Sequence, residues 1–551
     1  MVADPAAFPT LDDADMAALE AAGTRRAVAV GEYLFHAGDP SYDLFVVESG
    51  AVEIVADTDQ GERDVVRHGP RNFAGELNLL TGARVLVSAR VVEAGEVLIV
   101  PREEARRLIA DYPKLSDTLL SAFLARRALL QTGVPYTLRV VGSRYSADAV
   151  AIREFLTRTQ IPHQYLDPDG DTTVESLLRE FNVRPADLPV VITPRGVIRN
   201  ATAGSLAEYL GITVANLPKR CFDLVVVGGG PAGLAASVYG ASEGLGTLGV
   251  ERIAPGGQAG ASSRIENYLG FPTGISGGDL TQRAFVQAEK FGAQLTAPCT
   301  VASLRDENGY LMLTLSDGAD VAGRAVIAAT GARYRRLDVA GLDRFEGTSV
   351  FYAATTAEVR LCGPSPVIVV GGGNSAGQAV LFLAESGCAT RIVIRGDNLG
   401  KSMSRYLVER IMGDPSIEVM TNAEVTGLYG DVALRSVRVR HPDGETEIPC
   451  AALFSFIGAE PSSEWLSGCV ALDDHGFVLT DLELGRKHLG EQWDALQRTP
   501  LPFETSHPGL FAVGDVRSGS MKRVASAVGE GSAAVRSVHQ YLAFRATATS
   551  S

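Results

Sequence analysis

Residues 222–233 read Phe-Asp-Leu-Val-Val-Val-Gly-Gly-Gly-Pro-Ala-Gly, an apolar run that passes directly into closely spaced glycines. This pattern predicts a buried strand, a tight turn that favours glycine, and then a helix. The backbone N–H groups of such a turn and the positive end of the helix dipole converge on one point, where a pyrophosphate binds well. The stretch therefore predicts a dinucleotide-binding α/β unit.

A second stretch of the same kind lies later in the chain. Residues 367–376 read Val-Ile-Val-Val-Gly-Gly-Gly-Asn-Ser-Ala. One such pattern alone is a weak signal, since any single glycine can simply be a turn residue. Two of them in one chain indicate two dinucleotides held face to face, which is the layout of a flavoprotein that takes electrons from a nicotinamide.

The residue that follows the next strand after each pattern indicates which nucleotide binds there. The strand at 247–250 is followed by Glu251, whose carboxylate suits the ribose of FAD. The strand at 390–394 is followed by Arg395, whose guanidinium suits the 2′-phosphate of NADPH. NADH stays as the alternative cofactor, because a solvated surface charge is the other interpretation of Arg395.

Further motifs complete a family pattern. They read Ala-Pro-Gly-Gly-Gln at 254–258, Ile-Glu-Asn-Tyr at 265–268, Ala-Ala-Thr-Gly at 328–331 and Pro-Gly-Leu-Phe-Ala-Val-Gly-Asp at 508–515. With the two glycine patterns, they resemble the thioredoxin reductase family of pyridine-nucleotide flavoenzymes over residues 221–542. The resemblance implies FAD and NADPH as cofactors and a homodimer as the assembly.

The resemblance also implies which residues contact each cofactor. For FAD these are Gly228, Gly230, Pro231, Ala232, Gly233, Glu251, Gly257, Gln258, Asn267, Thr330, Gly331, Asp515, Arg523, Val524 and Ala525. For NADPH they are Gly371, Gly373, Asn374, Ser375, Ala376, Arg395 and Arg405. The family usually has two adjacent arginines where this chain has Arg395 and Gly396, so Arg405 and Lys401 are the candidates for the second cation.

The chain departs from the family at its redox centre. In thioredoxin reductases a CxxC disulfide precedes the second glycine pattern and relays electrons from the flavin. Here that place reads Ala354-Thr355-Thr356-Ala357, with alanine at both cysteine positions. An alanine methyl group cannot act as a thiolate or form a mixed disulfide. We therefore expect no catalytic side chain of this kind, and we interpret nearby Cys362 as an inert thiol.

Residues 136–214 repeat this loss. They resemble a thioredoxin or glutaredoxin fold, in which the redox pair would fall at Ser143 and Ser146. Pro189 stands at the start of a strand, as in that fold, and a cis Leu188–Pro189 bond is an expectation. A generic βαβ domain is the alternative, and in either case dithiol chemistry is absent from this segment.

Residues 30–100 show short strands separated by turns, and a helical stretch follows at 102–130. The segments 44–50 and 73–80 resemble a cyclic nucleotide-binding domain. The resemblance implies a ribose contact from Glu76. The arginine that holds the cyclic phosphate is replaced by Val87, and Arg84 lies three residues early. Burying a phosphate without a cation is costly. The domain fold is therefore favoured over actual binding of a cyclic nucleotide, and binding of another small ligand stays open.

Composition excludes several classes of protein. The chain has 551 residues and a net charge of −15, which argues against nucleic acid or an anionic membrane as the main partner. The N-terminus lacks a signal peptide, and the longest uncharged stretch, 224–242, contains the first glycine turn. Eight histidines without ligand spacing predict no metal site, and six cysteines without a CxxC pair indicate reduced thiols and a cytoplasmic location.

These observations predict a multidomain chain. Its units are a β-barrel (jelly-roll) cyclic nucleotide-binding-like domain at 1–132, a redox-inactive thioredoxin-like α/β domain at 136–214, and a doubly wound α/β two-dinucleotide-binding reductase. The reductase consists of an FAD domain at 219–335 and 458–545 and a nicotinamide domain at 336–457. The predicted reaction is hydride transfer from NADPH to FAD and then to an unknown external acceptor. The alternatives are a thioredoxin-disulfide reductase that uses a partner's thiols and a sensor with little turnover.

Overall fold

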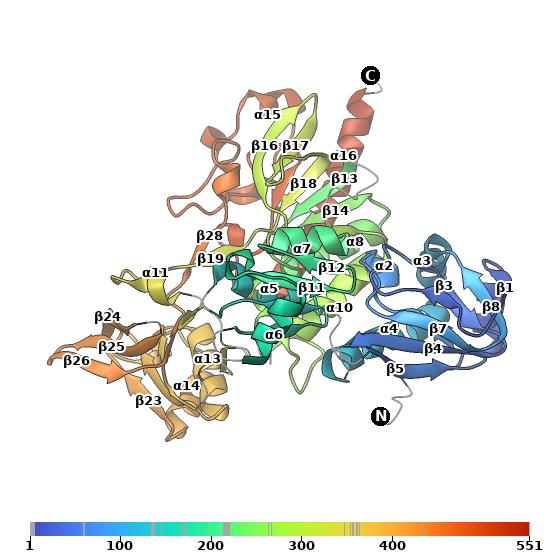
Figure 1. The fold of residues 1–551 in the computed structure, drawn as a ribbon. Coiled ribbons are helices and arrows are strands. Elements are labelled where there is room, and N and C mark those ends of the chain that lie inside the picture. The colour runs from blue at the N-terminus through green and yellow to red at the C-terminus, as the bar shows by residue number, and fades with distance from the viewer. Residues whose placement is uncertain are drawn as a thin grey trace.

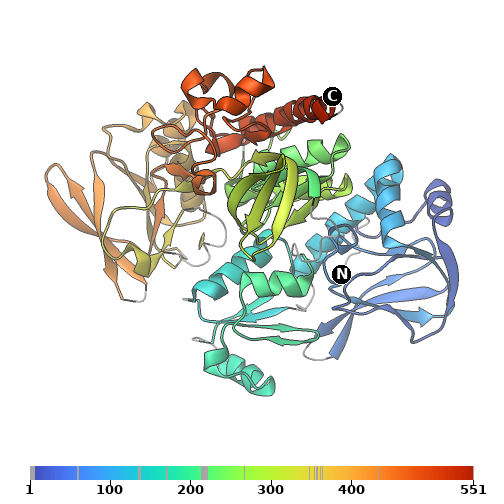
Figure 2. The same cartoon turned by 90° about the horizontal axis from the view of Figure 1, so that it is seen from above.

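The structure is a computed structural model that describes residues 6–549 except 59–60, 134–137, 145, 169–171, 213–220, 263, 266, 347, 353, 355–357, 360–361, 363 and 432. Figure 1 shows a blue N-terminal lobe, a cyan and green unit near the centre, a green to red sheet domain, and a yellow to orange lobe. The view from above keeps the cyan and green unit between the two outer lobes (Figure 2). The sequence predicts that residues 215–220 link the second unit to the first glycine pattern, and this segment lies outside the described residues.

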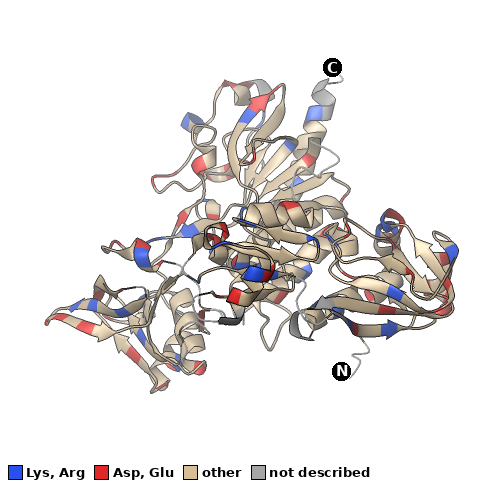
Figure 3. Cartoon of the chain, in the orientation of Figure 1, with Lys and Arg blue, Asp and Glu red and all other residues tan. Residues whose placement is uncertain are grey.

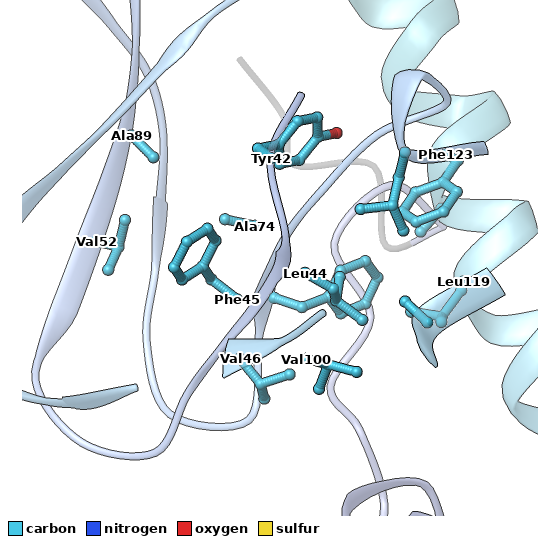
Figure 4. Close-up of a cluster of buried hydrophobic side chains, with 14 of the residues drawn as sticks. Tyr42, Leu44, Phe45, Val46, Val52, Ala74, Ala89, Val100, Leu119 and Phe123 are labelled. Atoms are coloured by element: carbon cyan, nitrogen blue, oxygen red, sulfur yellow. The ribbon is translucent and has the colours of Figure 1, made fainter. Parts of the chain in front are cut away.

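The first unit is a barrel of two antiparallel sheets, with strand orders β1-β8-β3-β6 and β2-β7-β4-β5. Its strands are β1 (Thr24–Val28), β2 (Tyr33–Phe35), β3 (Leu44–Val47), β4 (Ala51–Thr58), β5 (Gly61–His68), β6 (Phe73–Ala74), β7 (Ser88–Glu93) and β8 (Gly95–Val100). Its helices are α1 (Asp13–Glu20), α2 (Asn78–Thr81), α3 (Arg102–Asp111) and α4 (Pro113–Gly133). Figure 4 shows Leu44 of the barrel beside Leu119 and Phe123 of α4, and Phe45 on the side of Val52 and Ala74.

One sequence expectation for this unit is corrected. The helical stretch predicted at 102–130 is two helices, because Tyr112 is extended before Pro113. The proline ring disfavours a helical backbone at the preceding residue, so α3 ends there and α4 starts on the proline. The break turns α4 across the open side of the barrel, where it closes the core.

The second unit is a four-stranded mixed sheet of order β10-β9-β11-β12, in which β10 is parallel and β11 antiparallel to β9. Its elements are β9 (Arg139–Val141), α5 (Ala147–Arg158), β10 (Gln164–Leu166), α6 (Thr172–Glu180), β11 (Val190–Thr193), β12 (Gly196–Ile198) and α7 (Ala203–Leu210). Ser146 caps α5 by accepting a hydrogen bond from the Ala149 N–H. The Leu188–Pro189 bond is cis, as expected.

The third unit is a seven-stranded sheet whose parallel centre is β14-β13-β18, with β29 also paired to β18. Its strands are β13 (Cys221–Val227), β14 (Thr247–Val250), β15 (Gln294–Thr296), β16 (Val301–Glu307), β17 (Tyr310–Leu315), β18 (Asp320–Ala328) and β29 (Leu510–Ala512). Its helices are α8 (Pro231–Ser242), α9 (Gly257–Gly260), α10 (Gly277–Lys290), α15 (Glu491–Leu496) and α16 (Val524–Thr549). Because the central strands are parallel, their carboxyl ends meet at one edge.

The fourth unit is inserted between β18 and β29. It has a parallel sheet of order β20-β27-β21-β22-β23 and an antiparallel sheet β24-β25-β26. The strands are β20 (Val350–Phe351), β21 (Pro366–Val370), β22 (Ala389–Val393), β23 (Ile417–Met420), β24 (Glu424–Gly430), β25 (Leu434–His441), β26 (Gly444–Pro449) and β27 (Ala452–Ser455), and the helices are α11 (Leu342–Phe345), α13 (Asn374–Glu385) and α14 (Arg405–Gly413). The two connecting chains pair as antiparallel strands, β19 (Ala332–Tyr334) and β28 (Ala459–Pro461).

The first three units share apolar cores. Val286 of α10 belongs to the core cluster of the barrel, although it lies in the third unit. The core of the second unit includes Leu86 from the barrel side and Ala254 from the third unit. Arg195 of the second unit also forms an ion pair with Asp39 of the barrel. These shared contacts bury apolar surface between the units and fix the second unit in place.

Acidic and basic residues are interspersed over all the lobes (Figure 3). Within the part of the chain that the structure describes, we find no helix with the length and apolar character that crossing a membrane requires.

Glu289 of α10 makes the contact between the third unit and the barrel sensitive to pH. Its side chain is buried near Arg106 and Arg102 of α3, and burial raises the pKa of its carboxyl to about 7 despite both cations. Because this pKa is higher in the folded than in the unfolded chain, the stabilisation is complete below about pH 4.5. It is lost as the pH rises through about 7.

We expect Glu289→Gln to raise the midpoint of thermal unfolding by a few degrees at pH 8 and by less at pH 6, because the amide stays neutral. Differential scanning calorimetry of the full chain at both pH values measures this. Glu208→Gln, at an exposed position on α7, is the control and should change neither midpoint. An equal effect of Glu289→Gln at both pH values would contradict the assignment.

Candidate functional site

The first glycine turn packs directly against the end of the neighbouring strand. Gly228 has φ +109°, and a Cβ atom there would lie 2.3 Å from the carbonyl oxygen of Ala329. A Cβ at Gly233, on the first turn of α8, would lie 1.8 Å from the carbonyl oxygen of Gly228. Side chains are excluded at both positions by steric contact, so these two glycines shape the turn.

The second turn uses the same construction. Gly371 has φ +140°, and its Cβ would lie 2.3 Å from the carbonyl oxygen of Phe456, which follows β27. In both turns the first glycine approaches the carbonyl of a parallel neighbour strand. The chain thus builds two equivalent cradles from segments that are far apart in sequence.

Two other glycines face open space. Gly230 and Gly373 are the N-caps of α8 and α13, and no side chain caps either helix. A Cβ at Gly373 would meet nothing within 4 Å, and the nearest atom to one at Gly230 is the Cα of Gly257 at 3.8 Å. The first N–H groups of both helices are therefore free to bind anionic oxygens, and this fits the pyrophosphate of a dinucleotide.

Both cradles line one cavity of about 2450 Å³. The predicted FAD residues that line it are Gly228, Gly230, Pro231, Ala232, Glu251, Gly257, Gln258, Asn267, Thr330, Gly331, Asp515, Arg523 and Val524. The predicted NADPH residues that line it are Gly371, Gly373, Asn374, Ser375 and Arg395. Gly233, Ala376 and Ala525, on the first turns of their helices, do not line it.

Glu251 stabilises the first cradle through two hydrogen bonds from the backbone. One carboxylate oxygen accepts a hydrogen bond from the Gly229 N–H at 2.6 Å, and the other accepts from the Ile253 N–H at 3.0 Å. The carboxylate lines the cavity and keeps acceptor capacity for a ribose hydroxyl. Its position fits the adenosine half of a dinucleotide.

Asp515 lines the cavity from the connection between β29 and α16. Burial raises the pKa of its carboxyl, and Lys522 opposes the shift. Glu530 of α16 positions the turn, because it accepts a hydrogen bond from the Gly514 N–H at 2.7 Å and forms an ion pair with Arg517. Sequence reasoning missed Glu530, since nothing local marks it as different from any other helical glutamate.

The second cradle is closed by the loop before α14. The side-chain oxygen of Asn374 accepts a hydrogen bond from the Ser404 N–H at 2.6 Å, and Ser402 donates to the carbonyl of Gly372 at 2.9 Å. Arg395 lines the cavity beside them. Arg405 does not lie at the cavity: its side chain is 92% exposed and paired with Glu409 one helical turn later. The helical backbone of α14 directs it to solvent.

The second unit supplies a wall of the cavity that the sequence did not predict. Arg144, Arg153, Thr157 and Arg158, from α5 and the loop before it, line the cavity. Arg158 donates a hydrogen bond to the carbonyl of Gly257 at 3.3 Å, in the first cradle. The second unit therefore contacts the predicted FAD site directly.

The thiols form no pair at this site. None of the six cysteines, all of which lie in described parts of the chain, forms a disulfide, and among the described residues Cys299 alone lines the cavity. Burial raises the pKa of the Cys299 thiol to about 11, so it stays protonated at neutral pH. Ala354, at the first family cysteine position, packs half-buried against the core of the fourth unit. Ala357, at the second position, lies outside the described residues.

The predicted ligand residues of the barrel have other partners. The Glu76 carboxylate accepts a hydrogen bond from Arg127 at 2.7 Å, and both side chains are buried. Arg84 donates to the carbonyls of Gly38 and Tyr209 and packs over the Tyr209 ring, so it binds the second unit. Arg84 therefore does not lie beside Glu76, because its side chain lies at the interface between the barrel and the second unit.

The fold and the two opposed cradles define an α/β oxidoreductase with two dinucleotide sites. Residues 222–531 match the family model described as pyridine nucleotide-disulphide oxidoreductase, and residues 25–112 match the cyclic nucleotide-binding domain. The chain belongs to the pyridine nucleotide-disulphide oxidoreductase family, and it carries a cyclic nucleotide-binding domain at its N-terminal side.

Relatives narrow this class. Thioredoxin reductase of Mycoplasmopsis pulmonis is 30% identical over 316 residues, 57% of this chain and 95% of that protein. Thioredoxin reductase of Treponema pallidum is 32% identical over 327 residues, covering 58% and 97%. The structures of thioredoxin reductase from Lactococcus lactis (FR conformation) and T. acidophilum superpose with TM-scores of 0.51 and 0.52, each at 27% identity and covering 58% of this chain and 99% of theirs.

The chain is accordingly an NAD(P)H-dependent flavoprotein oxidoreductase of thioredoxin reductase-like type. Its relatives imply FAD and NADPH as cofactors, and the uncapped helix ends and open glycines of both cradles fit these groups.

Gly373→Ala tests the second cradle without disturbing the fold, because the new methyl group meets no protein atom within 4 Å. We expect the Kd for NADPH to rise at least about tenfold, or about 1.4 kcal/mol, since the methyl group blocks close approach of the pyrophosphate. FAD content and the unfolding midpoint should not change. Rapid-mixing kinetics of flavin reduction measure the Kd.

Gly413→Ala is the matched control for this substitution. It adds the same methyl group in equally open space, at the end of α14 and away from the cavity. An unchanged NADPH affinity in Gly373→Ala would show that the nucleotide does not approach α13.

Proposed function

We propose that this enzyme binds FAD at the first cradle and NADPH at the second, and that it passes electrons to an external acceptor without an internal dithiol. The observation that carries the proposal is the single cavity that both cradles line. Bound FAD and NADPH would supply the hydride-transfer chemistry. The protein contributes positioning and electrostatics, and its side chains take no covalent part in the reaction.

The chain's own residues have distinct tasks in this proposal. The N–H groups at the start of α8 and α13 bind the two pyrophosphates, and Glu251 binds the adenosine ribose. Asp515 and the first turn of α16 hold the flavin end, with Arg523 and Val524 against the ring. Arg395 pairs with the 2′-phosphate of NADPH, as its place beside the second cradle supports.

The absence of a CxxC pair from the sequence supports direct transfer to an acceptor. A lone protonated thiol such as Cys299 cannot form the intramolecular disulfide that a relay needs. We assign the second unit to a thioredoxin-like fold with Ser143 and Ser146 at the redox positions. Its topology and the contact of Arg158 with Gly257 support a structural role at the flavin cavity.

A thioredoxin-disulfide reductase that draws on a partner's thiols is the second candidate, which the thioredoxin reductase relatives favour. A sensor with little turnover is the third. The family resemblance further suggests a homodimer that works in the cytoplasm.

We expect an anaerobic reductive titration with dithionite to bleach the flavin completely after two electrons per FAD, because no second two-electron centre is present. Absorbance of the flavin band follows the titration. Uptake of four electrons would reveal a redox-active thiol pair and contradict the direct mechanism.

A panel of acceptors then separates the candidate functions. NADPH-driven turnover with a quinone, oxygen or an iron–sulfur protein supports direct transfer, whereas rapid reduction of a thioredoxin disulfide supports the second candidate. Fast flavin reduction by NADPH with slow reoxidation by every acceptor supports the sensor.

Arg395→Ala should raise KM for NADPH about tenfold and leave KM for NADH unchanged, because only NADPH carries the phosphate. Arg405→Ala is the matched control, since Arg405 is exposed and paired with Glu409 away from the cavity. Steady-state kinetics with both nucleotides measure the effect. An equal rise in KM for NADPH and for NADH would mean that Arg395 does not bind the 2′-phosphate.

A further inference from the structure

The barrel contains a second cavity, of about 120 Å³, between its strands and α4. Most of its wall is apolar and is formed by Phe35, Ile54, Val66, Val87, Leu129 and Leu130. Figure 4 shows the adjoining core, which includes Tyr42, Phe45 and Ala74 of the barrel. Neither the flavin chemistry nor the cradles use this cavity.

Tyr42, His68, Glu76 and Arg126 form the polar part of the wall, and Arg126 is the cation among them. Arg126 of α4 is 7% exposed and lines the cavity. Its Nε donates to the carbonyl of Ala7 at 2.8 Å, its Nη1 donates to the carbonyl of Gly75, and its guanidinium lies 4.2 Å from the centre of the Phe73 ring. These contacts fix the guanidinium. Its Nη2 has no hydrogen-bond partner among the described residues.

His68 is a second polar group with spare capacity. It is 1% exposed, it lines the cavity, and its Nδ1 has no hydrogen-bond partner within the described part of the chain. Burial lowers the pKa of the His68 imidazole to about 3, so the ring is neutral at physiological pH and can donate one hydrogen bond. Two unsatisfied buried groups in one small cavity are costly unless a ligand satisfies them.

The charges around the cavity do not balance. Arg126 and Arg127 each carry a positive charge, and Glu76 carries the one negative charge among the described side chains that oppose them. Glu76 is already held by Arg127, which contacts it through Nη2 at 2.7 Å and Nε at 3.2 Å. One positive charge, that of Arg126, is left for a monoanion.

Size limits the ligand further. An apolar cavity of roughly 150 Å³ accommodates a benzene ring in another protein, so the present volume suits an apolar body of about six carbon atoms. A nucleoside is about twice as large. A cyclic nucleotide would also need Glu76 for its ribose, and Glu76 is engaged by Arg127.

We propose that the barrel binds a small monocarboxylate with an apolar body, such as an aromatic acid or a short fatty acid, rather than a cyclic nucleotide. The carboxylate pairs with Nη2 of Arg126 and accepts a hydrogen bond from His68, and the body fills the apolar cavity. This assignment is independent of the proposed flavin function.

Isothermal titration calorimetry of the full-length, flavin-loaded protein tests the proposal with benzoate and hexanoate as probes. Benzyl alcohol and cyclic AMP serve as comparison compounds. At least one carboxylate should bind, and benzoate should bind at least about tenfold more tightly than benzyl alcohol, because the alcohol lacks the charge. Tighter binding of cyclic AMP than of both carboxylates, or no binding of either carboxylate, would overturn the proposal.

Arg126→Met keeps the bulk of the side chain and removes its charge. It should weaken carboxylate binding about tenfold or more and abolish the preference over benzyl alcohol. Arg67→Met, on the outer face of the same barrel, is the control and should change neither property. Unchanged carboxylate binding in Arg126→Met would overturn the proposal.

Val66→Phe provides a second test if Arg126→Met does not fold. It fills the cavity from a half-buried position on β5 and leaves the charged groups in place. It should abolish carboxylate binding while the flavin spectrum and NADPH oxidation stay as in the unmodified protein. Retained carboxylate binding would place the ligand elsewhere and contradict the assignment.

Discussion

Two contacts between a glycine and a carbonyl oxygen determine the geometry of the reductase half. Gly228 lies against Ala329 and Gly371 against Phe456, at distances that no Cβ atom tolerates. Each contact holds a turn at the carboxyl end of its sheet, so the helix that follows must start at the cavity. The uncapped N–H groups of α8 and α13 then face the same space, and the charge of two pyrophosphates has a place to bind.

The units that precede the reductase are part of its structure. Val286 packs into the barrel core, and Leu86 and Ala254 both pack into the core of the second unit. Burial of these side chains fixes α5 beside the first cradle, where Arg158 reaches Gly257. The second unit, whose sequence contains no cysteine, thus encloses one side of the cavity.

The barrel also uses its charged residues for contacts within the protein. Arg84 binds the second unit, Glu76 is bound to Arg127, and Arg126 lies against the apolar cavity. Each of these charged groups has a protein partner: Arg84 the carbonyl of Tyr209, Glu76 the guanidinium of Arg127, and Arg126 the carbonyl of Ala7. A buried charge is costly without a partner, and this explains why Glu76 and Arg127 are paired.

The sequence by itself determined the glycine turns, the strands before them and the order of the units. These features depend on a few adjacent residues: a turn with positive φ requires glycine, and an apolar run predicts a buried strand. For example, the strand predicted at 247–250 is β14 with the same ends. Only the tertiary structure decided that Arg158 contacts the first cradle, that Glu530 positions the flavin turn, and that Arg84 and Arg405 lie away from their expected sites. Most of these pairings join residues far apart in the chain, and no local pattern specifies which distant backbone a long arginine side chain will reach.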